Sequence, residues 1–60
     1  RIRLLKLALD DEHSRVRTAA VRAVGMMGGP EAFPILVELL QDSLPVVRTY
    51  AAGNLIHLLQ

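Results

Sequence analysis

The sequence predicts an all-α fold of four short helices that form two similar pairs. When the chain is shifted by 31 residues against itself, seven of the 29 overlapping positions are identical. Apolar residues also recur at the spacing of a helix face, and no segment alternates with the two-residue period of a strand. Self-similarity at a fixed period indicates repeated structural units. The identical pairs are Leu5/Leu36, Leu9/Leu40, Asp11/Asp42, Val16/Val47, Arg17/Arg48, Thr18/Thr49 and Ala20/Ala51.

The first helix is expected to end before a polar loop at residues 10–13. Ile2, Leu5 and Leu9 line one face of it, and charged residues lie opposite. The chain begins without methionine and inside this apolar pattern. We therefore expect a truncated first helix and a segment of a longer array.

The second helix is expected between that loop and Gly28-Gly29, because glycine ends helices readily. Its apolar stripe is predicted to face the core. The opposite face carries Arg15, Thr18, Arg22 and Met26, although Met26 and Met27 are expected to fill the core or the contact between repeats. The stripe consists of Val16, Ala19, Ala20, Ala23, Val24 and Met27.

The third and fourth helices are separated by a break at residues 42–45. Pro30 suits the first turn of the third helix, where its missing N–H leaves no hydrogen bond unmade. Pro34 is tolerable close to that start. The third helix is expected to bury a face that includes Phe33, Leu36 and Leu40. The fourth places Val47, Tyr50, Ala51, Asn54, Leu55 and Leu58 on its stripe.

Composition narrows the functional classes. The chain has 60 residues, a net charge of +1, 52% hydrophobic residues and no cysteine. These values exclude a strongly basic nucleic-acid arm, an acidic tail, a disulfide framework and a thiolate zinc site. They leave the cellular compartment open. No stretch approaches the roughly 18 uninterrupted apolar residues of a membrane-spanning helix.

The blocks Leu9-Asp10-Asp11-x4-Val16-Arg17-x-x-Ala20 and Leu40-Gln41-Asp42-x4-Val47-Arg48-x-x-Ala51 resemble HEAT repeats. The period of about 31 residues is similar to the short HEAT-like subtype found in phycobilin lyases and many scaffolds. The resemblance covers essentially the whole chain, with repeat 1 at residues 1–29 and repeat 2 at 30–60. It implies an α-solenoid (an α-α superhelix) of stacked helix pairs.

The resemblance also implies roles for particular side chains. The second helix of each pair would line the concave surface. A polar ladder between repeats would use Asp11, Arg17, Asp42 and Arg48. The concave strip would then carry Arg15, Thr18, Arg22, Thr49 and His57, and these are the residues we expect to contact a partner.

Candidate catalytic and metal-binding features are weak. Four adjacent residues in Asp10-Asp11-Glu12-His13 rarely converge on one ion, and acidic residues are favoured at a helix start. In the similar deoxyhypusine hydroxylase, His-Glu pairs follow the motif arginine; Thr18-Ala19 and Thr49-Tyr50 stand there in this chain and cannot bind iron. We expect no metal, no cofactor and no catalytic residue in this segment.

We therefore predict a non-catalytic scaffold or protein-interaction module that binds a protein partner. Two alternatives stay open: a lyase-type enzyme whose catalytic residues lie outside this segment, and a solenoid that binds nucleic acid through its basic strip. The basic charge lies in residues 1–30, which have a net charge of +3 against −2 for residues 31–60. Two phosphate contacts would give only a weak, salt-sensitive affinity for nucleic acid. Neighbouring repeats or self-association are expected to cover the uncapped ends.

Overall fold

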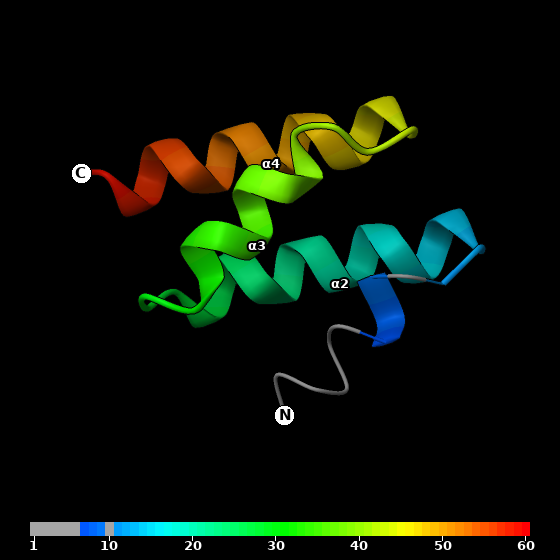
Figure 1. The fold of residues 1–60 in the computed structure, drawn as a ribbon, viewed down its shortest axis with the longest axis horizontal. Helices are drawn as coiled ribbons and strands as arrows, with labels where there is room; N and C mark the ends of the chain where they lie inside the picture. The colour runs from blue at the N-terminus through cyan, green and yellow to red at the C-terminus, as the bar shows by residue number, and fades with distance from the viewer. Residues whose placement is uncertain (1–6, 10) are drawn as a thin grey trace.

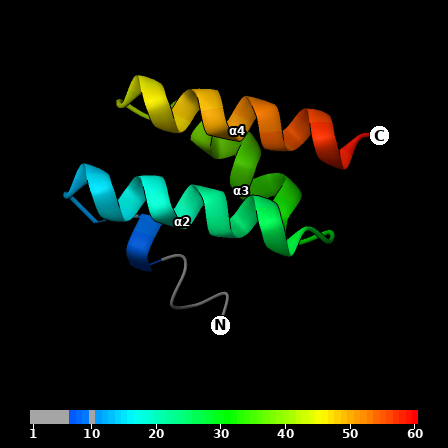
Figure 2. The same cartoon turned by 180° about the vertical axis from the view of Figure 1, so that it is seen from behind.

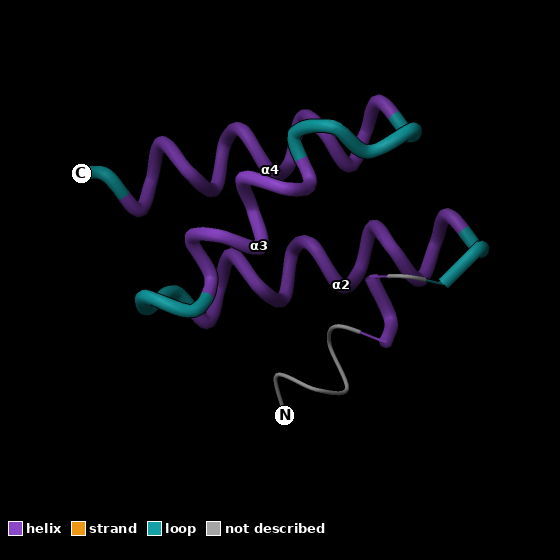
Figure 3. The backbone as a smooth tube through the Cα atoms, viewed as in Figure 1, coloured by secondary structure: helices purple, strands orange, loops and turns teal. Residues whose placement is uncertain are grey.

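The computed structural model describes residues 7–9 and 11–60. The described chain contains α2 (Ser14–Met27), α3 (Ala32–Leu39) and α4 (Pro45–Leu58), and residues 7–9 are also helical. Helices α2 and α4 lie side by side and run in the same direction (Figures 1 and 2). Helix α3 crosses in front of them in Figure 1 and behind them in Figure 2. Short loops join the helices, and no strand occurs in the described part (Figure 3). The all-α prediction is confirmed, whereas Ile2 and Leu5 lie outside the described residues.

Both ends of α2 follow from local chemistry. His13 adopts an extended backbone before the helix, and its carbonyl accepts hydrogen bonds from the N–H groups of Val16 and Arg17, each at 3.1 Å. At the other end, Gly28 has a φ of 65°, and its N–H donates to the Val24 carbonyl at 3.2 Å. Glycine adopts positive φ without steric cost, so the predicted glycine stop is confirmed.

The prolines lie at helix starts, but two of them differ from the prediction. Helix α3 begins at Ala32, so Pro30 precedes it rather than forming its first turn. Pro34 is the third helical residue, where the backbone nitrogen has no partner in the helix. Pro45, placed in the break by the sequence, is instead the first residue of α4.

The core lies where α3 packs against both α2 and α4. Leu36, Val21, Val24 and Val47 are its largest fully buried side chains. Val21 was not on the predicted stripe of α2, whereas Val16 and Met27 were, and they are 38% and 40% exposed. Helix α2 is therefore rotated about its axis relative to the prediction, because contact with α3 and α4 together selects the face that contains Ala20, Val21 and Val24.

Two further apolar predictions are wrong. Phe33 is 43% exposed, because α3 buries Ala32, Leu36 and Leu39 instead. Met26 is 87% exposed and fills neither the core nor a helix contact. The consequence is a surface on α2 that mixes apolar and basic side chains.

Candidate partner-binding surface

The five residues predicted to contact a partner are distributed over two adjacent helices. Arg15, Thr18 and Arg22 belong to α2, and Thr49 and His57 belong to α4. All are exposed except Thr18, which is half-buried. Because their spacings of three, four, seven and eight residues place them on one side of each helix, we call this set the binding strip. Met26 is the exposed apolar side chain beside it on α2.

Arg22 is oriented by an aromatic side chain. Its guanidinium carbon lies 5.6 Å from the centre of the Tyr50 ring, across the contact between α2 and α4. An arginine over an aromatic face is attracted by the negative face of the ring. Tyr50 was expected on the apolar stripe, yet it is 36% exposed. This contact holds one basic group of the binding strip in place and was not anticipated from the sequence.

The two threonines of the binding strip use their hydroxyl protons internally. The Thr18 hydroxyl donates to the Ser14 carbonyl at 2.8 Å, and the Thr49 hydroxyl donates to the Pro45 carbonyl at 3.0 Å. This bond to the carbonyl four residues earlier is usual for threonine inside a helix. Toward a partner, each hydroxyl oxygen therefore remains an acceptor.

A close contact brings α2 and α4 together. The Asn54 side-chain amide donates to the Val21 carbonyl at 3.1 Å. A Cβ at Gly25 would collide with the Asn54 side chain, so only glycine leaves room for it. We call this contact the seam: Val21, Arg22 and Gly25 on α2 against Tyr50 and Asn54 on α4. Two features of the sequence point to this contact: Asn54 is a polar residue on an apolar stripe, where a buried amide requires a hydrogen-bond partner, and Gly25 is a glycine inside a helix.

An ion pair links the start of α2 to the loop that precedes α4. Arg17 Nη2 donates to Asp42 Oδ2 at 3.3 Å, and the side chains are only 16% and 15% exposed. Arg17 Nη1 also donates to the Asp11 carbonyl at 3.2 Å. Arg17 thus connects Asp11 with Asp42, and the fourth residue assigned to the ladder, Arg48, bonds Asp42 as well. Arg48 makes the equivalent local bond, with its Nη1 2.7 Å from the Asp42 carbonyl.

Asp11 and Asp42 form the same turn at equivalent positions. Asp42 Oδ2 accepts from the Leu44 N–H at 2.9 Å. Asp11 Oδ1 accepts from the His13 N–H at 2.8 Å and contacts His13 Nδ1 at 2.7 Å. The hydrogen bond from the His13 backbone, followed by that from its ring, lowers the pKa of Asp11 below its ordinary value.

This shift predicts a pH-dependent difference between the wild type and Asp11→Asn. Because the folded state favours the charged carboxylate, Asp11 contributes stability at pH values above its ordinary pKa. That contribution is lost as the pH falls through the lowered value. Asp11→Asn should be less stable than the wild type at about pH 5, and the gap should narrow toward about pH 3. Denaturant midpoints followed by circular dichroism measure this, and a gap that stays constant would contradict it.

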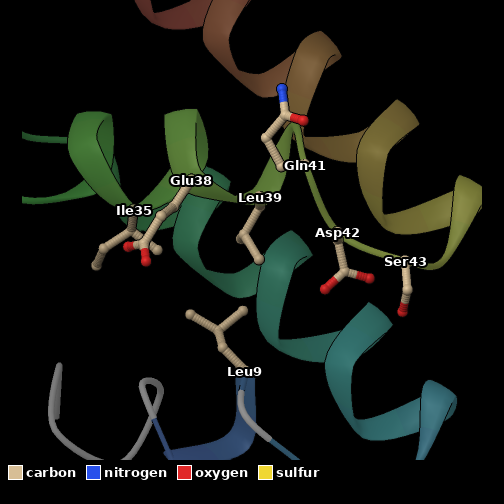
Figure 4. Close-up of a pocket in the computed structure, with 7 residues that line it drawn as sticks. All are labelled: Leu9, Ile35, Glu38, Leu39, Gln41, Asp42 and Ser43. Carbon is tan, nitrogen blue, oxygen red and sulfur yellow. The ribbon is translucent and has the colours of Figure 1, made fainter.

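A hollow of about 480 Å³ lies between the helical residues 7–9 and α3. Its lining residues do not form a recognisable catalytic or metal-binding arrangement. Leu9 and Leu39 point toward one another across it, and Asp42 and Ser43 lie at one end (Figure 4). Asp42 is already bonded to Arg17 and Leu44. No group of three potential metal ligands occurs among residues 7–9 and 11–60, and Asp10 of the acidic cluster lies outside them.

Comparison with known proteins gives one match. A family model described as HEAT repeats matches residues 2–56. No curated protein and no solved structure matches significantly. Within the part of the chain that the structure describes, no helix combines the length and apolarity needed to cross a membrane.

Proposed function

We propose that this chain, which belongs to the HEAT-repeat family, is a non-catalytic interaction module that binds a protein partner along the binding strip. HEAT repeats commonly mediate protein interaction or scaffolding. One observation carries the assignment to this surface: Arg15 and Arg22 are exposed on α2 beside the exposed strip residues of α4. A surface that combines arginine, an aromatic ring and an exposed methionine has the composition of protein interfaces.

The chemistry of the strip favours an acidic, partly apolar peptide segment. Neither Arg15 nor Arg22 forms an ion pair with any residue that the structure describes. Arg22 already lies over the Tyr50 ring, so less side-chain entropy is lost when it pairs with a carboxylate. Met26, which is 87% exposed, offers a flexible apolar contact next to these charges.

The four ladder residues have a separate, structural role in this proposal. We take residues 1–29 and 30–60 as the two repeats, joined by the pair of Arg17 and Asp42. Asp11 and Arg48 occupy the equivalent positions at the outer ends. Chemistry is usually performed once, whereas stacking is needed in every repeat. The recurrence of these residues at one offset therefore supports a structural assignment.

Charge reversal on the strip tests the proposed function. Immobilised wild-type chain is used to capture proteins from a nuclease-treated lysate, and the captured protein is then titrated against Arg15→Glu with Arg22→Glu. We expect at least about tenfold weaker binding, because two attractive contacts become repulsive. Unchanged affinity would remove the binding strip from the interface.

Two controls sharpen this test. The pair Val37→Glu with Gln41→Glu adds negative charge to exposed positions on or just after α3 and should leave binding nearly unchanged. The neutral pair Arg15→Gln with Arg22→Gln lowers the net charge by the same amount on the strip and should weaken binding. Proteins that are captured from an untreated lysate but lost after nuclease treatment would instead support the nucleic-acid alternative.

A further inference from the structure

The exposed side of α2 that faces away from α4 carries a shallow apolar hollow. Its volume is about 450 Å³. Val16 is 38% exposed, and Ala19 is also exposed. The lining side chains are small and apolar apart from Arg15 at the edge: Ala8, Arg15, Val16, Ala19, Ala20 and Ala23.

The 31-residue offset relates this hollow to the seam. At the seam, Tyr50 and Asn54 of α4 contact α2. Ala19 and Ala23 stand at the equivalent positions of α2. The hollow is therefore the same helix face that α4 already uses to pack on a neighbouring helix, and on α2 no described residue covers it.

The surface that would complement the α2 hollow lies on the exposed face of α4. Gly25 of α2 receives Asn54 at the seam, and the residue equivalent to Gly25 is Ile56. Ile56 is 61% exposed. At the seam, the large side chain (Asn54) belongs to α4 and the small residue (Gly25) to α2. At the equivalent positions on the exposed faces the sizes are exchanged, with the small residue (Ala23) in place of Asn54 and the large one (Ile56) in place of Gly25. A bulky side chain on one face thus matches a hollow on the other.

Arg48 and Asp11 could form an ion pair between two chains that is equivalent to the pair of Arg17 and Asp42 within one chain. Arg17 bonds its own loop through Nη1 and reaches Asp42 through Nη2. Arg48 makes the local bond through Nη1, and its Nη2 has no partner among the described residues. Asp11 accepts from His13 through Oδ1, so its Oδ2 is available to accept a further hydrogen bond. The net charges of +3 in residues 1–30 and −2 in residues 31–60 also favour contact between the first half of one chain and the second half of another.

We propose that a second copy of this chain docks head to tail, with Ile56 of one protomer in the α2 hollow of its partner. Arg48 of the first protomer would pair with the partner's Asp11, as Arg17 pairs with Asp42 within the chain. The two surfaces are different, so the contact is heterologous and leaves one free end of each kind. Association therefore continues beyond the dimer as concentration rises.

Sedimentation of the full chain tests the proposal. Between about 10 µM and about 1 mM, a range suited to a small interface, the average mass should rise steadily above 6.6 kDa without a plateau at the dimer. Ile56→Asp should keep the mass at that of the monomer, as should Ala23→Asp. Val37→Asp, at a 44% exposed position on α3, should associate like the wild type.

Mixing the two interface variants gives the sharpest result. Ile56→Asp retains the hollow and Ala23→Asp retains Ile56, so the mixture should form 1:1 dimers while each variant alone stays monomeric. Ala19→Asp replaces Ala23→Asp if circular dichroism shows that the latter does not fold. A monomeric wild type, association of Ile56→Asp as strong as that of the wild type, or a mixture that fails to pair would each overturn the proposal. No partner protein is present in this experiment, so its outcome is independent of the binding-strip test.

Discussion

Asp42→Ala is expected to lower the free energy of unfolding by about 2–4 kcal/mol. The substitution removes the carboxylate that pairs with Arg17 and also accepts from the Leu44 N–H just before α4. The figure is below the loss typical of a fully buried pair, since both side chains keep about 15% exposure and some solvent screening. A domain of this size has about 3–9 kcal/mol of stability in total, so the effect is large.

Asp11→Ala is the matched control for Asp42→Ala. Asp11 forms the same turn and bonds the His13 N–H, but its carboxylate lacks the Arg17 contact. Its loss should lower the free energy of unfolding by clearly less than the loss of Asp42, because Asp11 contributes a solvent-exposed turn hydrogen bond and no ion pair with Arg17. Urea unfolding followed at 222 nm compares the two variants, and equal losses would mean that the pair of Arg17 and Asp42 contributes no stability.

Gly25→Ala and Gly53→Ala are expected to change stability in opposite directions. Both glycines lie inside helices, where alanine is favoured by roughly 1 kcal/mol. A Cβ at Gly53 meets open space, so that variant should gain about this amount. A Cβ at Gly25 would collide with Asn54 at the seam, and overpacking should produce a net loss of about 1–3 kcal/mol.

A double-mutant cycle assigns the loss at Gly25 to the seam. In an Asn54→Ala background the obstructing amide is gone, and the Val21 carbonyl loses only its bond from that amide. Gly25→Ala should then stabilise the chain, much as Gly53→Ala does. If alanine at position 25 is destabilising in both backgrounds, the cause lies within α2 and not in its contact with α4.

The helices and the family could be predicted because they depend on periodicity. The 31-residue offset, the polar loop before Ser14 and the Gly28-Gly29 stop are features of the sequence itself. The rotation of α2 could not be predicted, because this alanine-rich helix offers two adjacent apolar faces. Only the packing of α3 and α4 decides that Val21 is buried and Val16 is exposed.

The sequence was sufficient to predict which helix face carries the arginines of the binding strip, but not which side chains they contact. Helical spacing and the resemblance to HEAT repeats placed Arg15 and Arg22 on one face of α2. The stacking of Arg22 on Tyr50 depends on the distance between two helices, which single-helix patterns do not contain. The same holds for the fit of Asn54 against Gly25, although an amide on an apolar stripe indicated that a partner must exist.

The placement of Tyr50 makes the chain its own optical reporter. The sequence has one tyrosine, one phenylalanine and no tryptophan, so near-ultraviolet circular dichroism around 280 nm comes from Tyr50 alone. That ring lies at the junction of α2 and α4, under the Arg22 guanidinium. Signal at 222 nm reports helix content everywhere, whereas the tyrosine band reports one junction. Heating the protein while recording both bands therefore separates the parting of the two helices from their melting.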